Sequence, residues 1–211
     1  MTRSFKLLIL TVLAISAIGG DTAAAAAFEK PPGPITSTIT PDGSGKNKHK
    51  VWDIPGHFLT CAEENGTFTS GDAATQISQL ISAAWNYIGC VMLGQEATVS
   101  MNGCNYAFHA SGVTDILCPP GNEITFSVPS PPCDVKIAAQ SGLGTVTYSN
   151  INGETEVTVS QSITGISGTA SGAGCPATGS FTNGNVTTGN FILTAEKDDG
   201  TTTMVKLRRT P

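Results

Sequence analysis

The sequence predicts an all-β domain, an antiparallel β-sandwich built from hairpins and stapled by disulfides. Only 13% of the residues are charged, whereas 24 of the 211 are glycine and serine and threonine are abundant, which is typical of short strands and turns. The six cysteines are an even number and all follow an apolar N-terminal segment. An even cysteine count in an exported chain indicates three disulfides.

The N-terminal segment has the pattern of a secretory signal peptide over residues 1–27. Arg3 and Lys6 precede an apolar run of 12 residues, Leu7 to Ile18, and Ala23 to Ala27 offer several A-x-A cleavage sites. Twelve residues are too few to cross about 30 Å of hydrocarbon as a helix. We therefore expect a secreted protein with no transmembrane segment, cleaved near Ala27.

Residues 28–50 predict a disordered Pro/Gly linker, and residues 51–211 a single β domain. Four prolines punctuate the linker, which ends in the basic run Lys46-Asn47-Lys48-His49-Lys50. This basic run suits either a solvated linker or adhesion to an anionic wall polymer. Four basic residues are weak evidence for adhesion, so the solvated linker is the favoured interpretation.

The first half of the domain contains one ambiguous segment. Residues 57–61 and 66–69 have the composition of strands, and so do residues 88–93. Between them, Ile77, Leu80, Ile81, Ala84 and Trp85 fall on one helical stripe, although their neighbours resemble strands. The pattern predicts one short helix over about residues 73–84, with a strand as the alternative.

The central segment, residues 97–120, predicts a disulfide-stapled hairpin. Cys104 and Cys118 are equidistant from Ser111, so a three-residue loop, Ala110-Ser111-Gly112, places them opposite each other. Tyr106 then faces Ile116 on the same side of the hairpin as the cysteines. Six cysteines allow 15 connectivities, and our remaining assignments are Cys61–Cys90 and Cys133–Cys175.

Two further hairpins are predicted nearer the C-terminus. An Asn152-Gly153 turn would place Tyr148 opposite Val157 and Val146 opposite Val159. A three-residue loop at Asp198-Asp199-Gly200 would place Phe191 opposite Leu207 and Leu193 opposite Val205. Each register gives one apolar and one polar face.

The search for catalytic and metal-binding motifs predicts no enzyme and no cofactor. G-x-S-x-G, H-E-x-x-H and C-x-x-C are all absent from the sequence. His57 and His109 both border turns, and no carboxylate is tied to either by spacing. Glu63-Glu64 and Asp198-Asp199 suit calcium or a glycosidase, but acidic residues in predicted loops more often serve turn chemistry. The formal net charge of −5 argues against nucleic acid as a partner.

Aromatic side chains supply the candidate ligand-binding residues. Trp52, Trp85 and Tyr87, together with Tyr106, are candidates for a platform that stacks on sugar rings. Only 6% of the chain is aromatic, however, and the core of the domain needs most of these side chains. Core packing is therefore the competing interpretation.

The segments Ala97 to Tyr106 (ATVSMNGCNY), Cys118-Pro119-Pro120-Gly121 and Gly144 to Tyr148 resemble a family of uncharacterised exported β-proteins of high-GC Gram-positive bacteria. The resemblance covers about residues 91–190. The chain departs from the family pattern at Thr75 to Tyr87, where that pattern has a plain strand. The resemblance implies an exported, disulfide-bonded β domain from a bacterial host, and no known activity.

These observations give three functional hypotheses. The first is a non-catalytic module with a structural or interaction role at the cell surface or in the extracellular space. Its partner would be a cell-wall polymer or another extracellular protein. The second is a carbohydrate-binding module that uses exposed aromatic residues, and the third is a small secreted hydrolase.

Overall fold

A computed structural model describes residues 25–41, 50–54, 57–70, 74, 76–151, 156–187, 191–197, 204–205 and 208–210. These residues form strands and loops, and no helix occurs among them. The predicted all-β fold is therefore confirmed. The predicted signal peptide lies almost wholly outside the described residues, and its boundary, Ala27, is the first residue of a strand.

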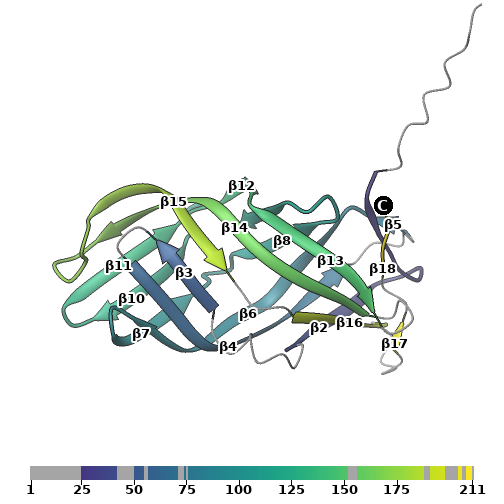
Figure 1. The fold of residues 1–211 in the computed structure, drawn as a ribbon, viewed down its shortest axis with the longest axis horizontal. Coiled ribbons are helices and arrows are strands. Elements are labelled where there is room, and N and C mark those ends of the chain that lie inside the picture. The colour runs from purple at the N-terminus through teal and green to yellow at the C-terminus, as the bar shows by residue number, and fades with distance from the viewer. Residues whose placement is uncertain are drawn as a thin grey trace, which may run out of the picture.

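The strands form one small sheet and one large antiparallel sheet (Figure 1). The small sheet has the order β18-β1-β5, with bounds β1 (Ala27–Glu29), β5 (Gln76–Ile77) and β18 (Arg208–Thr210). The strands of the large sheet are β2 (Ile35–Pro41), β3 (Lys50–Ile54), β4 (His57–Ser70), β6 (Gln79–Met92), β7 (Gln95–Ser100), β8 (Asn105–His109), β9 (Thr114–Leu117), β10 (Ile124–Pro129), β11 (Pro132–Ile137), β12 (Gln140–Leu143), β13 (Thr145–Ile151), β14 (Glu156–Ser171), β15 (Gly179–Thr187), β16 (Phe191–Lys197) and β17 (Met204–Val205).

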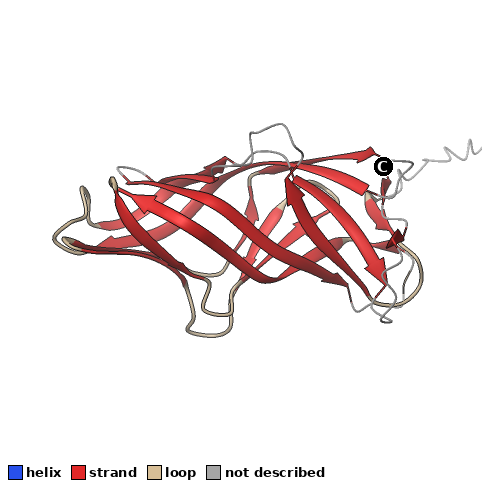
Figure 2. Ribbon diagram, turned by 90° about the horizontal axis from the view of Figure 1, so that it is seen from below, coloured by secondary structure: helices blue, strands red, loops and turns tan. Residues whose placement is uncertain are grey.

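The large sheet folds back on itself and gives an elongated, sandwich-like molecule. Its strand order is β12-β9-β8-β6-β7-β10-β11-β14-β15-β3-β4-β2-β16-β17, with β13 beside β14 and additional β4–β6 and β14–β16 pairings. In Figure 1, β13, β14 and β15 cross in front of β6 and β8. Figure 2 shows the same long strands crossing at an angle. Because β4, β6 and β14 are long, each pairs with different neighbours along its length.

The core lies between the crossing layers and is built from alternate residues of each strand. On β14, Val157, Val159 and Ile163 are buried, as alternation in a strand with one buried face requires. Rings from β6 and β8 face them, with Trp85 packed edge-on against Tyr106 at 5.5 Å between centroids. A cavity of about 10 Å³ between these layers has room for no more than a water molecule.

The helix predicted over residues 73–84 is wrong for the residues that are described, because β5 and β6 begin at Gln76 and Gln79. On β6 the buried residues are Leu80 and Ser82, then Trp85 and Tyr87, then Cys90 and Met92. The odd step from Ser82 to Trp85 contains Ala84 in the left-handed region, at φ 51°. An extra residue of this kind is a β-bulge, which turns the following side chains to the other face.

The linker predicted over residues 28–50 is also wrong where it is described, at residues 28–41 and at Lys50. Phe28 in β1 is fully buried and packs edge-on against Tyr148, and Ile35 and Ser37 of β2 are buried. The four prolines mislead because they lie outside the strands or at the end of β2, where a missing N–H is tolerated. Residues 42–49, which include most of the basic run, lie outside the described residues.

The register of the central hairpin is as predicted, whereas the two later hairpins differ from prediction by two residues. Tyr106 pairs with Ile116 in β8–β9. Tyr148 pairs with Val159 rather than Val157, and Ala195 rather than Leu193 pairs with Val205. The turns themselves, within residues 152–155 and 198–203, lie outside the described residues.

Three disulfides join Cys61 to Cys90, Cys104 to Cys118 and Cys133 to Cys175, and among the described residues no cysteine is free. Cys61 and Cys90 are directly opposed on β4 and β6. The second bridge closes the base of the β8–β9 hairpin, and the third ties β11 to the segment after β14. Each bridge has the partners expected from the sequence.

Candidate functional site

The outward face of the β8–β9 hairpin carries a histidine–carboxylate pair, His109 and Asp115. The loop Ala110-Ser111-Gly112 is tight: the His109 N–H donates to the Val113 carbonyl at 2.8 Å and the Gly112 N–H donates to the His109 carbonyl at 2.9 Å. Gly112 has φ 95°, which glycine adopts without strain. Alternation along the two strands then places both polar side chains on the face away from Tyr106 and Phe108.

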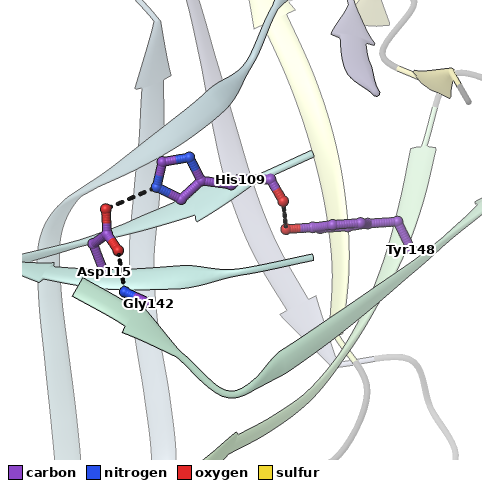
Figure 3. Close-up of polar contacts among 4 residues, drawn as sticks. All are labelled: His109, Asp115, Gly142 and Tyr148. Atoms are coloured by element: carbon purple, nitrogen blue, oxygen red, sulfur yellow. Dashed lines mark hydrogen bonds and ion pairs between the residues drawn. The ribbon is translucent and has the colours of Figure 1, made fainter. Parts of the chain in front are cut away.

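Both carboxylate oxygens of Asp115 are engaged (Figure 3). Oδ2 lies 2.9 Å from His109 Nε2, and Oδ1 accepts a hydrogen bond from the Gly142 N–H at 2.8 Å. Partial burial disfavours the carboxylate, but hydrogen bonds from Gly142, His109 and Ser141 outweigh it and hold the pKa of Asp115 below its usual value. Asp115 therefore links the hairpin to β12 as an ionised group.

Residues of β13 and β18 also form hydrogen bonds with the tip of the β8–β9 hairpin. The Tyr148 hydroxyl donates to the His109 carbonyl at 2.9 Å (Figure 3), and the Val146 N–H donates to the Gly112 carbonyl at 2.8 Å. Arg209 Nε donates to the Ala110 carbonyl at 3.0 Å. Burial raises the pKa of Tyr148 far above neutrality, so its hydroxyl keeps the proton that it donates.

Within the fold, the His109–Asp115 pair ties the β8–β9 hairpin to β12. A catalytic histidine oriented by a carboxylate needs its second nitrogen beside a nucleophile or substrate. His109 has an exposed side-chain fraction of 27%, and no serine, threonine or cysteine side chain is recorded in a hydrogen bond with its ring among the described residues. Over the same residues, no three His, Cys, Asp or Glu side chains gather as a metal site.

His57 and the acidic pairs give no site within the described residues. His57 pairs with Ile54 across β3 and β4, and its side chain lies outside the description. Glu63 and Glu64 lie within β4 rather than in the predicted loop, opposite Ile88 and Tyr87. Asp198 and Asp199 fall outside the described residues.

Three of the four aromatic ligand candidates, Trp85, Tyr87 and Tyr106, are core residues. Trp85 is 5% exposed and Tyr87 is 7% exposed, and the Tyr87 hydroxyl is hydrogen-bonded to that of Tyr106 at 2.9 Å. Burial raises the pKa of both tyrosines, so both stay neutral. The prediction that Trp85 and Tyr87 form an exposed sugar platform is therefore wrong. Trp52 pairs with Leu59 and Val186, and its side chain lies outside the description.

A second polar feature was not predicted from the sequence. An open groove of about 410 Å³, the polar groove, is lined by Asn102, Gly121, Asn122, Glu123, Thr125 and Lys136. The turn residues Asn102-Gly103 and Gly121-Asn122 are visible in the sequence, with Asn102 and Gly121 at positive φ. The sequence does not show that these two turns lie together. The pairing of β7 with β10, which are separate segments of the chain, brings Asn102 and Asn122 side by side.

Among the described residues, no helix is long and apolar enough to cross a membrane. All three disulfides are compatible with an extracellular protein. The resemblance to exported proteins of high-GC Gram-positive bacteria stays a prediction, since comparison of the chain with family models, with curated proteins and with solved structures gave no match.

Proposed function

We propose that this protein is an exported, non-catalytic module with a structural or interaction role at the cell surface or in the extracellular space. The observation that carries the proposal is the disulfide framework. Every cysteine of the chain is in a bridge, and each bridge fixes strands or loops of the same fold. Such frameworks persist in oxidising compartments and are rare where thiols are kept reduced.

The placement of the polar and aromatic residues supports a non-catalytic role. The His109–Asp115 pair, which would be the natural centre of a hydrolase, is bonded to Gly142 and lies on a hairpin held by Tyr148 and Arg209. A small secreted hydrolase therefore ranks below an interaction module.

Carbohydrate binding is the second candidate, in a form different from an aromatic platform. Trp85 and Tyr87 are unavailable because they pack in the core. The polar groove offers instead the carboxylate of Glu123, the amide of Asn122 and the ammonium group of Lys136, and carboxylate, amide and ammonium groups all bind hydroxyls through hydrogen bonds.

The proposal is tested by binding of the oxidised mature protein, residues 28–211, to intact cells of high-GC Gram-positive bacteria and to their purified walls. We expect the protein to sediment with both. A parallel assay with chromogenic ester, peptide and glycoside substrates, on the protein and on His109→Ala, addresses the hydrolase. Turnover that disappears in His109→Ala would overturn the non-catalytic assignment, and failure to bind any cell or wall fraction would overturn the surface role.

A further inference from the structure

The outer surface of β7, β10, β11, β14 and β15 carries a continuous row of polar side chains. Directly paired residues run across these strands in the order Ser100, Thr125, Lys136, Thr169 and Ser180. Four of the five are exposed and Thr125 is half-buried. In Figure 1, β7, β10 and β11 lie at the left end, and β14 and β15 extend from there towards the middle of the molecule. Neighbouring strands are about 4.8 Å apart, so the row presents polar groups at regular intervals.

A second row runs parallel to the first, one strand pleat away. It consists of Thr98, Ser127, Asp134 and Ser171. Within it, the Ser127 hydroxyl donates to Asp134 Oδ1 at 2.6 Å. The residues between the two rows, Phe126 and Val135, are fully buried, so the polar side chains are on the opposite, outward face. We call these two rows the hydroxyl face.

The polar groove forms one end of the hydroxyl face and shares Thr125 and Lys136 with it. Asn102 organises the groove: its Oδ1 accepts from the Ser100 hydroxyl at 2.7 Å, and its Nδ2 donates to the Glu123 carbonyl at 2.8 Å. Asn122 Nδ2 donates to the Asn102 carbonyl at 2.7 Å. Asn102 Nδ2 also donates to the Thr125 hydroxyl at 3.3 Å. Asn122, Glu123 and Lys136 line the same open groove.

We infer that the hydroxyl face and the polar groove together bind an uncharged, hydroxyl-rich polysaccharide of the cell surface. Sugar hydroxyls both donate and accept hydrogen bonds, and the surface offers groups of both kinds: serine and threonine hydroxyls, a carboxylate, an amide and an ammonium group. The whole surface carries two carboxylates, Glu123 and Asp134, and one ammonium group, Lys136, so it does not favour an anionic polymer. The strands and the bonded turns fix these groups in place before binding, which reduces the entropy lost on association.

The same surface is poorly suited to other macromolecules. Protein interfaces concentrate their binding energy in tryptophan, tyrosine and arginine, whereas serine and threonine are under-represented at such positions. Neither row contains an aromatic residue or an arginine. Nucleic acid needs clustered cations, and the two rows offer only Lys136. Each hydrogen bond contributes little free energy, so a single sugar would bind weakly. A polymer that repeats the same sugar along the row would bind with higher affinity through multivalency.

This inference rests on the proposed surface role, and the experiment separates the two. The oxidised protein is mixed with insoluble walls, and neutral polysaccharide released from the same walls is added as a soluble competitor. The test variant is Thr98→Val with Thr169→Val, which removes one exposed hydroxyl from each row and keeps the β-branched shape. The matched control is Thr145→Val with Thr147→Val on β13, where both threonines are also exposed. A second test variant, Glu123→Gln, keeps the size of the side chain in the groove.

We expect the neutral polysaccharide to compete with the walls, and the double test variant to bind at least about 10-fold more weakly than the control variant, given two lost hydrogen bonds. Thermal unfolding of each variant verifies that it is folded. Wall binding that all variants retain would overturn the hydroxyl face while leaving the surface role intact. Binding that competes only with anionic polymer, or that protease treatment of the walls abolishes, would overturn the ligand class. If the unaltered protein binds no wall or cell fraction, the surface role itself fails.

Discussion

The two hairpins β8–β9 and β13–β14, which are joined by the hydrogen bond from Tyr148 to His109, are fixed by different means. The β8–β9 hairpin has a disulfide at its base, a three-residue turn at its tip and the His109–Asp115 pair between its strands. The β13–β14 hairpin has no covalent link. Its start is set by backbone packing, since a Cβ on Gly144 would lie 2.3 Å from the Ile163 Cα. The β8–β9 hairpin is stabilised by a disulfide, which reduction breaks. The β13–β14 hairpin is stabilised by close backbone packing at Gly144, which an added methyl group would disrupt.

The largest effect is expected from Gly144→Ala. Gly144 has φ 56° and its missing Cβ leaves room for the backbone of Ile163, so an alanine requires β13 and β14 to separate. We expect a loss of at least about 3 kcal/mol in the free energy of unfolding, measured by urea titration. The control is Gly142→Ala, at φ 76° with open space around it, where only backbone strain of about 1 kcal/mol is expected. Equal losses in both variants would remove the distinction between the hairpins.

The next effect is expected from Cys104→Ala with Cys118→Ala. The bridge spans 14 positions of the chain, and a loop of this length stabilises a protein by about 3 kcal/mol in the chain-entropy description. Urea unfolding measures the change, and peptide mapping without reductant verifies the remaining pairs, Cys61–Cys90 and Cys133–Cys175. A loss below about 1 kcal/mol would show that the turn and the ion pair hold the β8–β9 hairpin without the disulfide.

A smaller effect is expected from Tyr148→Phe, which tests the contact between the hairpins. The change removes the hydrogen bond to the His109 carbonyl and keeps the ring that packs against Phe28. Loss of one such bond should lower the free energy of unfolding by about 1 kcal/mol. Tyr106→Phe is the comparison, because it removes a hydrogen bond to Tyr87 inside one layer. Faster amide exchange at the β8–β9 tip in Tyr148→Phe alone would identify the contact as the link between the hairpins.

The smallest effect is expected from pH acting on Asp115. Its pKa is lowered in the folded protein, so the carboxylate contributes stability that is present above the unfolded value of about 3.9 and is lost as pH falls through the folded value. The thermal midpoint of the unaltered protein should therefore fall more steeply below about pH 4 than that of Asp115→Asn. Because the pair is partly exposed, the difference should shrink in high salt. Parallel profiles would show that Asp115 does not couple ionisation to folding.

The same two hairpins show what the sequence can determine. The register of β8–β9 follows from the positions of Cys104 and Cys118 about Ser111, because a disulfide fixes which residues are opposite. The register of β13–β14 was inferred from Asn152-Gly153, and a turn signal does not fix the length of the loop. The error was two residues, which is the smallest error that keeps Val157 and Val159 on the buried face.

The helix error in β6 has a local cause. A regular strand buries every second residue, but the bulge at Ala84 adds one position between Ser82 and Trp85. Together with the bend at Ser78, it places Ile77, Leu80 and Trp85 inside at spacings that match a helix. Ile81 and Ala84, which completed the helical stripe, are not buried. Two local irregularities, the bend at Ser78 and the bulge at Ala84, therefore imitate the periodicity of a helix.

The hydroxyl face could not have been predicted from the sequence. Thr125 and Thr169 are each ordinary outward residues of alternating strands. They come within reach of each other only because β11 lies between β10 and β14, a lateral order that local pattern does not encode. The disulfide Cys133–Cys175 was the one long-range signal, since it ties β11 to the end of β14.

The pairing of β1 with β18 makes the folded chain nearly a closed ring. Ala27 lies opposite Thr210, and the Thr210 hydroxyl donates to the Ala27 carbonyl at 3.1 Å. A short peptide could therefore join these positions, and the chain could be opened elsewhere without changing the order of its strands. The pairing also sets an orientation: both positions lie at the opposite end of the molecule from β7, β10 and β11 (Figure 1). A partner fused at either position would point away from the hydroxyl face and leave it uncovered.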